Sequence, residues 1–193
     1  MARLLSLIKK SIDISFDYSA WAGPLKPDLL DELRRKFSET RITISIDTGS
    51  ERLRGRLGRR FCSNEDYFRF FDELKNRGMS ARAYFIIGLP YETQEDVGKT
   101  VEFVRRLQKE YPKTFEDNIQ IFPLYLELGS RIFQNPGEFG MRISRSSLKE
   151  WMDYTKALEQ EETLGDDLGV YRVGESLKTI KRLYQRVMSE IRV

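Results

Sequence analysis

The stretch 81–93, which reads ARAYFIIGLPYET, holds the residues best placed to bind a ligand. Its apolar run, Ala83–Ile87, stops at Gly88-Leu89-Pro90, where a glycine lets the backbone approach a flat ligand without a Cβ in between. In α/β proteins, ligands bind at such corners between the carboxyl end of a strand and the next helix. The corner alone also has a purely structural interpretation, because any turn between a strand and a helix can contain Gly and Pro.

Other kinds of chemistry are excluded by what the 193 residues lack. There is no His, which excludes Ser-His and Cys-His nucleophile pairs and imidazole metal sites. The single Cys62 cannot form an internal disulfide, a thiolate-ligated cluster or a structural zinc site. We therefore predict neither a catalytic residue nor a metal ligand.

Composition and charge indicate a globular, cytoplasmic protein. Apolar residues make up 40% and charged residues 33%, and no window approaches the roughly 18 apolar residues of a membrane span. The basic start, Met1–Lys10, is too short for a signal peptide, and one Cys fits a reducing compartment. Abundant Lys, Arg and Glu weakly suggest a thermophilic source.

Strand and helix patterns alternate along the first two thirds of the chain. The predicted strands are Ile12–Tyr18, Arg41–Asp47, Ala83–Ile87 and Asn118–Leu126, and the predicted helices run from Pro27 to Phe37, Asn64 to Arg77 and Gln94 to Glu110. This alternation predicts an α/β fold with about four parallel βα units. Pro123 implies that the last strand stops pairing early or lies at an edge. The carboxyl ends of the strands are expected to form one surface.

After Gly140 the pattern changes to helices. Ser147-Leu148-Lys149-Glu150 is a capping box that opens a helix to about Leu164, and the apolar spacing of Leu177–Ile191 indicates a final amphipathic helix. We predict two parts, a βα part over residues 1–140 and a C-terminal helical extension over residues 141–193 that packs on it.

Four segments together resemble the radical SAM superfamily, most closely its cobalamin-binding and methylthiotransferase-like branches. They read IDTGS (46–50), LGRRF (57–61), GLPYET (88–93) and FPLYLELGS (122–130), in the order and at the intervals that this family has. The resemblance covers about Ile12 to Gly140. It implies that residues 1–140 are the C-terminal portion of a partial TIM-like barrel and that S-adenosylmethionine is the cofactor.

The resemblance also implies ligand-binding roles. Asp47 would accept hydrogen bonds from the ribose hydroxyls, and Arg59 would bind the methionine carboxylate. Further residues of these segments would hold the adenine or complete the site: Ser50, Gly88, Leu89, Pro90, Phe122, Pro123 and Leu124. Asp47 could instead form an Asx turn with Gly49, and Arg59 could be a surface charge.

Departures from the family pattern limit what the chain could do alone. The CxxxCxxC loop that holds the four-iron four-sulfur cluster is absent, so a cluster could come only through a missing N-terminal half. Tyr91 stands where the family has Gly, and Glu92 is expected to cap the next helix. By itself the chain is expected to be inactive.

Three functions follow. The first is an excised or split portion of a radical SAM enzyme, which binds S-adenosylmethionine and, with the cluster-binding half, cleaves it reductively to a 5′-deoxyadenosyl radical. The second is a degenerate paralogue that acts as a binding or scaffold module, because a strand at Ile12 would leave an exposed edge for self-association or for the missing half. The third is RNA binding, as in tRNA-modifying relatives, through Arg52–Arg60; it is disfavoured because no aromatic platform is interleaved there and the net charge is only +3.

Overall fold

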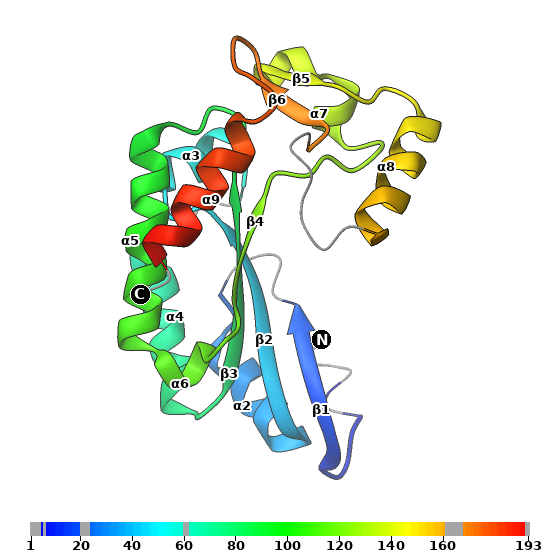
Figure 1. The fold of residues 1–193 in the computed structure, drawn as a ribbon. Coiled ribbons are helices and arrows are strands. Elements are labelled where there is room, and N and C mark those ends of the chain that lie inside the picture. The colour runs from blue at the N-terminus through cyan, green and yellow to red at the C-terminus, as the bar shows by residue number, and fades with distance from the viewer. Residues whose placement is uncertain (1–4, 6, 20–23, 60–61, 161–167, 192–193) are drawn as a thin grey trace. The chain divides into compact units, whose positions relative to one another are not determined.

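A computed structural model describes residue 5 and residues 7–19, 24–59, 62–160 and 168–191 (Figure 1). The chain forms two compact units, one of Met1–Phe85 with Gly98–Gln120 and one of Ile86–Val97 with Ile121–Val193. The predicted boundary between residues 140 and 141 differs from this division and stays a prediction.

Strands and helices alternate as the sequence pattern predicts. In chain order the elements are β1 (Ile12–Ser19), α2 (Pro27–Lys36), β2 (Phe37–Asp47), α3 (Glu51–Arg56), α4 (Asn64–Asn76), β3 (Ser80–Ile87), α5 (Gln94–Glu110), α6 (Pro112–Phe115), β4 (Ile119–Pro123), α7 (Arg131–Gln134), η1 (Pro136–Phe139), β5 (Met141–Ile143), α8 (Leu148–Gln160), β6 (Val170–Arg172) and α9 (Thr179–Ile191). The last predicted strand ends at Pro123, because proline has no N–H to donate to a neighbouring strand.

The first four strands form one sheet in the order β1-β2-β3-β4. The β1–β2 and β2–β3 pairs are parallel, with Asp17 opposite Arg41 and Ile44 opposite Ala83. Sequential order distinguishes this sheet from a doubly wound sheet, in which the order reverses at a switch point. The predicted fold class, an α/β fold with four parallel βα units as in a partial TIM-like barrel, is confirmed.

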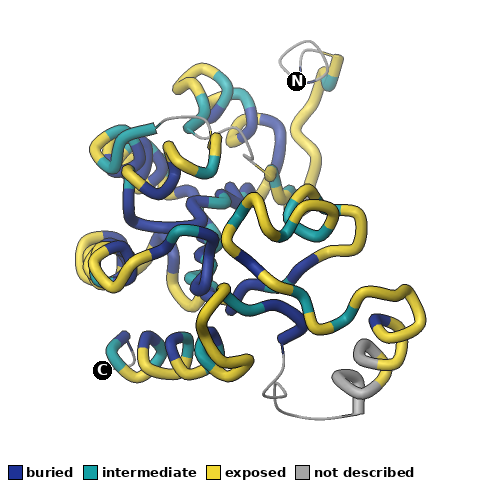
Figure 2. The backbone as a smooth tube through the Cα atoms, turned by 90° about the horizontal axis from the view of Figure 1, so that it is seen from above, coloured by how far each residue is buried: buried dark blue, intermediate teal, exposed yellow. Residues whose placement is uncertain are grey.

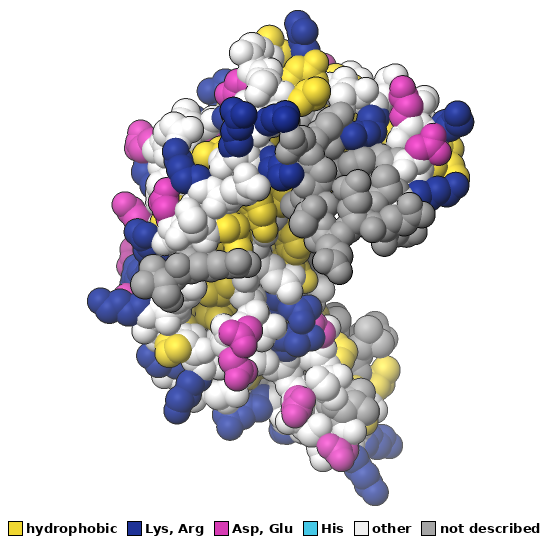
Figure 3. Space-filling view, viewed as in Figure 1, with side chains coloured by type: hydrophobic (Ala, Val, Ile, Leu, Met, Phe, Trp, Pro, Cys, Tyr) yellow, Lys and Arg dark blue, Asp and Glu magenta, His cyan; other side chains and the backbone are white. Residues whose placement is uncertain are grey.

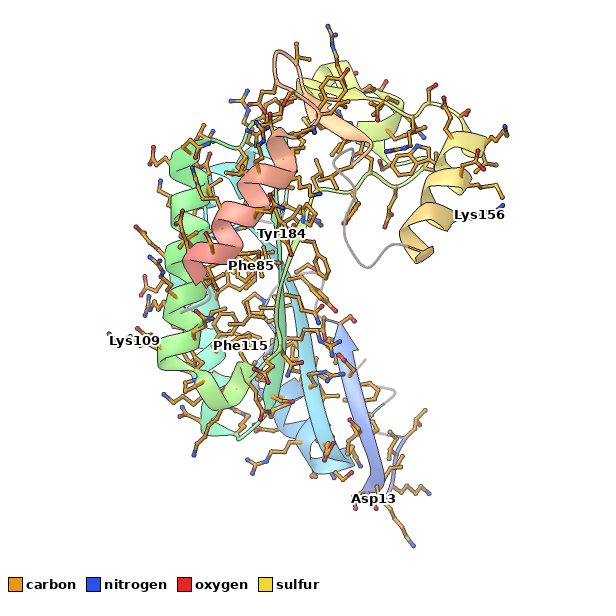
Figure 4. All side chains as sticks on the ribbon, in the orientation of Figure 1. Asp13, Phe85, Lys109, Phe115, Lys156 and Tyr184 are labelled. Atoms are coloured by element: carbon orange, nitrogen blue, oxygen red, sulfur yellow. The ribbon has the colours of Figure 1, made fainter. Side chains whose placement is uncertain are left out.

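The first unit buries one face of its strands under aromatic side chains. Ile42, Ile44 and Ile46 are at most 1% exposed, whereas Arg41 and Ser45, on the opposite face of the same strand, are partly exposed. Figure 2 shows the buried positions following the strands and the inner sides of the helices. In Figure 4, Phe85 of β3 and Phe115 of α6 lie on the side that the helices cover. Rings of this cluster pack edge to face, as Phe71 and Phe115 do at 5.0 Å between centroids.

The second unit contains a small antiparallel pair, β5 with β6, in which Met141 lies opposite Arg172. The sequence did not predict it, because strands of three residues are too short for an alternating pattern to be recognised. Ser147 and Glu150 form the predicted capping box at the start of α8, whose predicted end near Leu164 lies outside the described residues. The predicted final helix is confirmed as α9.

Within the described part of the chain, no helix is long and apolar enough to cross a membrane. Nor do three or more Cys, Asp or Glu side chains gather there in a way that could hold a metal ion.

Candidate functional site

Asp47 ends β2 in an unusual backbone conformation. Its φ is +65°, in the left-handed region, and the register between β2 and β3 shifts between Ser45 and Asp47. Asp tolerates this region better than most residues because its short polar side chain can form local hydrogen bonds. The residue is 3% exposed, so β2 delivers a buried carboxylate at its carboxyl end.

Arg59 reaches this carboxylate because of the way α3 ends. Gly58 has a φ of +68°, and the N–H groups of Gly58 and Arg59 donate to the carbonyls of Gly55 and Arg54, both at 3.1 Å. These two bonds form a Schellman motif, which reverses the chain after the helix. The Arg59 Nε then lies 2.6 Å from Asp47 Oδ2, and the Arg59 side chain is 50% exposed. Two residues predicted from separate segments are thus in direct contact.

The electrostatics of Asp47 are set mainly by its burial. Loss of water raises the pKa of the Asp47 carboxyl above its ordinary value, against the opposing effects of the Arg59 and Arg54 guanidinium groups. Hydrogen-bond donors favour the charged form of a buried carboxylate. The site therefore suits a ligand that brings hydroxyl donors to Asp47.

The expected alternative for Asp47, an Asx turn with Gly49, is wrong. The Gly49 N–H donates instead to Thr100 Oγ1, at 3.0 Å. Thr48 Oγ1 lies 3.0 Å from the same hydroxyl, so the turn after β2 is fastened to α5. The Asp47 carboxylate is left to interact with Arg59.

Ser50 occupies the N-cap of α3. Its hydroxyl accepts the Leu53 N–H at 3.3 Å, and its own N–H donates to Thr48 Oγ1 at 3.1 Å. The residue is fully buried. Its hydroxyl therefore has a structural task, and its ligand role stays a prediction.

Arg54 is a central residue of this corner that the sequence did not single out. Its side chain donates to the carbonyls of Thr48 and Cys62 and to Asn64 Oδ1, and its guanidinium lies 5.3 Å from the centre of the Tyr67 ring. Burial lowers the pKa of Arg54, which is 1% exposed. One of five arginines in a short stretch is easily read as a surface charge. Its burial could have been predicted from its position in the helix capped by Ser50, directly after the buried Leu53.

The burial of Arg54 bears on the RNA-binding alternative. A side chain that is 1% exposed cannot contact a phosphate backbone, so the Arg52–Arg60 run has fewer accessible cations than its sequence suggests. Figure 3 shows Lys and Arg side chains scattered over the visible face and interleaved with Asp and Glu. Arg60 and Phe61 lie outside the described residues.

In the second unit, the Gly88-Leu89-Pro90 corner is buried. Gly88 has a φ of +95°, and a Cβ there would lie 2.5 Å from Ile180 Cγ2, so both the backbone conformation and the space demand glycine. The Leu124 N–H donates to the Ile87 carbonyl at 2.7 Å. This bond joins the predicted segment 122–124 to the residue before the corner.

Glu92 does not cap α5, contrary to the prediction. Thr93 is the N-cap, and its N–H and hydroxyl both donate to the Asp96 carboxylate, at 2.8 and 2.7 Å. Glu92 turns back instead and accepts the Gly88 N–H at 2.7 Å. The Thr93-x-x-Asp96 capping box confirms the hydroxyl cap that the sequence pattern Thr93-Gln94-Glu95-Asp96 predicts, and it leaves no capping role for Glu92.

The predicted site residues therefore fall into two groups. Asp47, Ser50 and Arg59 lie together in the first unit, and the Gly88–Pro90 and Phe122–Leu124 segments lie together in the second. Pro123 and Leu124 are buried, whereas Phe122 is 42% exposed. That the two groups form one nucleoside-binding surface stays a prediction.

Comparisons with known proteins agree with the sequence motifs. The sequence model of the Radical SAM superfamily matches residues 1–104, more than half of the chain. The ribosomal protein uS12 methylthiotransferase RimO of Thermosipho melanesiensis is 24% identical over 186 residues, which cover 92% of this chain and 40% of that protein. An uncharacterized protein of Methanocaldococcus jannaschii is 32% identical over 91 residues, which cover 46% of this chain and 20% of that protein.

Among solved structures, coproporphyrinogen III oxidase (HemN) from Escherichia coli, described as a radical SAM enzyme, aligns with a TM-score of 0.47 and 19% identity. The alignment covers 94% of this chain and 41% of that one. The chain thus spans less than half the length of each of these three proteins.

Proposed function

Since the chain belongs to the Radical SAM superfamily, we propose that it is the S-adenosylmethionine-binding portion of a radical SAM enzyme. The contact between Asp47 and Arg59 is the observation that carries this proposal. A buried carboxylate and a half-exposed guanidinium, from segments that match two family motifs, offer an acceptor for ribose hydroxyls and a donor for a carboxylate. In the cell we place this chain in the cytoplasm, in keeping with its single Cys.

The residues of this chain fit the cofactor but not the iron-sulfur cluster. Asp47 would bind the ribose and Arg59 the methionine carboxylate, while Gly88-Leu89-Pro90 and Phe122-Pro123-Leu124 would hold the adenine. When bound, S-adenosylmethionine would supply the adenosyl 5′-carbon, which is bonded to the sulfonium sulfur and becomes the radical centre on reductive cleavage. Cluster ligation takes several thiolates, and the chain has only Cys62, so the chain alone is proposed to be inactive.

Calorimetric titration with S-adenosylhomocysteine tests the proposal. We expect Asp47→Ala to weaken binding about tenfold or more, since a hydrogen bond to a charged group contributes about 1.5–3 kcal/mol. Asp17→Ala is the matched control, because Asp17 also lies on a strand and pairs with an arginine, Arg41, at 2.7 Å. Its affinity should stay within twofold of the wild type. No binding by the wild type, or equal losses in both variants, would contradict the proposal.

We also propose a partner at the free edge of β1. Among the residues that the structure describes, this strand is at the end of the sheet and has β2 as its one neighbour, and Ile12 on it is 39% exposed. An open edge strand is a template for pairing with another chain. The proposed occupant is the N-terminal cluster-binding half, with a second copy of this chain as the alternative under the scaffold function.

Light scattering after size exclusion distinguishes these occupants. A monomer that forms a one-to-one complex with a CxxxCxxC-bearing segment supports the split enzyme, and a dimer that Ile12→Lys dissociates supports self-association. A monomer that does not bind such a segment would contradict both.

A further inference from the structure

Glu92 links the ligand corner of the second unit to the C-terminal part of the chain. Its side chain is fully buried, and its Oε2 accepts both the Gly88 N–H at 2.7 Å and Arg172 Nη2 at 3.2 Å. Arg172 is the last residue of β6 and lies 80 positions further along the chain. One carboxylate oxygen therefore connects the turn after β3 with the small antiparallel pair.

Helix α9 contacts the corner at one place and the start of the following helix, α5, at another. The Ile180 side chain fills the space beside Gly88 where a Cβ would otherwise lie. Arg186 Nη2 donates to Gln94 Oε1 at 2.7 Å, at the start of α5. The corner is thus held from two directions by elements that follow residue 140.

The corner is also fastened on the side of η1. Tyr91 has a φ of +62°, which side chains rarely adopt, and its hydroxyl donates to the Glu138 carbonyl at 2.6 Å. A backbone in this region persists only where its surroundings impose it. The conformation of the corner therefore depends on contacts from outside its own sequence.

The Glu92–Arg172 pair is poorly built for stability alone. Glu92 Oε1 and Arg172 Nε are both buried and have no hydrogen-bond partner among the described residues. Buried ion pairs contribute to stability only when their remaining polar atoms are satisfied, and unsatisfied buried atoms point to another reason for keeping the pair. Holding the Gly88 N–H in one orientation is such a reason.

We propose that Glu92 and Arg172 are positioning residues, through which the segment after residue 140 fixes the Gly88-Leu89-Pro90 corner for ligand binding. The ligand part of this inference rests on the proposed function. Neither residue is proposed to touch the ligand; each acts through the backbone of Gly88. Ligand affinity is then set partly by β6 and α9, outside the four segments that resemble the family.

Hydrogen exchange and calorimetry on the full chain test the two parts separately. Arg172→Met keeps an unbranched apolar stem and removes the charged guanidinium, and Glu92→Gln keeps an acceptor for the Gly88 N–H. We expect amide exchange in residues 86–97 to accelerate at least fivefold in Arg172→Met and less in Glu92→Gln. The dissociation constant for S-adenosylhomocysteine should rise five- to tenfold in Arg172→Met and recover in Arg172→Lys.

Arg131→Met is the matched control, because Arg131 pairs with Glu138 at 3.6 Å in the same unit but both side chains are exposed. It should change neither exchange nor affinity. If Arg172→Met unfolds, Glu92→Gln carries the comparison as the disrupting variant, and Arg172→Lys remains the variant that should behave like the wild type.

Unchanged exchange in the Arg172 and Glu92 variants would overturn the positioning role, as would faster exchange with unaltered affinity. Faster exchange in a chain whose wild type binds no S-adenosylhomocysteine would support the link to the corner and refute the proposed function.

Discussion

The two units each hold a buried carboxylate, Asp47 at the end of β2 and Glu92 in the turn after β3, but they hold it differently. Asp47 pairs with Arg59, which is near in sequence and 50% exposed, whereas Glu92 pairs with Arg172, which is far along the chain and 17% exposed. An exposed partner can exchange one carboxylate for another, and a buried one cannot without leaving a charge unpaired. The comparison indicates that the Asp47 corner is built to interact with a ligand and the Glu92 corner to hold its own backbone.

The largest expected effect concerns the glycine after Asp47. A Cβ at Gly49 would lie 2.4 Å from the Lys99 carbonyl oxygen and 2.8 Å from Thr100 Cα, which are backbone atoms that cannot move aside. We expect Gly49→Ala to lower the free energy of unfolding by about 3 kcal/mol or more, measured by urea denaturation.

Alanine substitutions at two other glycines give free energies of unfolding with which the Gly49→Ala value can be compared. Gly55→Ala meets nothing within 4 Å and should stabilise α3 by about 0.5–1 kcal/mol. Gly88→Ala would combine a φ of +95° with a Cβ 2.5 Å from Ile180 Cγ2. A side chain can shift where the backbone beside Gly49 cannot, so the cost should lie between those of the other two substitutions. A Gly49→Ala variant as stable as the wild type would show that the turn after Asp47 can move away from the backbone of Lys99 and Thr100, and therefore that this turn does not hold Asp47 in a fixed position.

The second prediction is a pH dependence that Glu92 contributes. Burial raises the pKa of Glu92 to about 7 from its ordinary 4.5, with Asp96 adding to the shift and the Gly88 N–H and Arg172 opposing it. Glu175, 3.6 Å from Arg172, is the next charged group. The folded chain therefore binds this proton more tightly than the unfolded chain, and stability should fall as the pH rises from about 4.5 to 7.

The measurement is the free energy of unfolding at pH 5 and pH 8. Glu92 accounts for a loss of about 3 kcal/mol over its titration range, which Glu92→Gln should remove. Asp47→Asn should flatten the pH dependence in the same direction but less, because two guanidinium groups oppose the rise in the pKa of Asp47. If the free energy of unfolding changes equally with pH in the wild type and in Glu92→Gln, Glu92 is not the group that titrates. If Asp47→Asn removes more of the pH dependence than Glu92→Gln does, then Asp47, and not Glu92, is the carboxylate that titrates most strongly on folding.

Most of the fold could be predicted because strands and helices of eight or more residues carry their own period. The α5 bounds, Gln94 to Glu110, and the early end of β4 at Pro123 needed only apolar spacing, a cap and the missing proline N–H. The pair β5–β6 could not be predicted, because strands of three residues are shorter than two repeats of the pattern.

The site could be predicted only in its parts. Asp47 and Arg59 followed from motifs, but the Schellman motif that joins them depends on Gly58, which resembles any loop glycine in the sequence. Arg54 and Arg172 escaped notice because charged residues are expected at the surface, and their burial depends on partners elsewhere in the chain. Tertiary contacts of this kind leave no local pattern.

The smallest effect is expected at Arg59, and it tests the comparison directly. The Arg59 side chain is 50% exposed, so water screens its charge and can take its place beside the buried Asp47. Ion pairs that water screens contribute about 1 kcal/mol or less, so Arg59→Met should cost about that amount in urea denaturation at pH 7. Breaking a buried pair costs about 3–5 kcal/mol, so Arg172→Met should cost clearly more. Salt should separate them too, because 1 M NaCl screens exposed charges and hardly affects buried ones. If Arg59→Met proves as costly as Arg172→Met and equally insensitive to salt, the Asp47–Arg59 pair is a fixed structural contact. A ligand carboxylate could not then replace Asp47 on the guanidinium, and Arg59 would lose its proposed role.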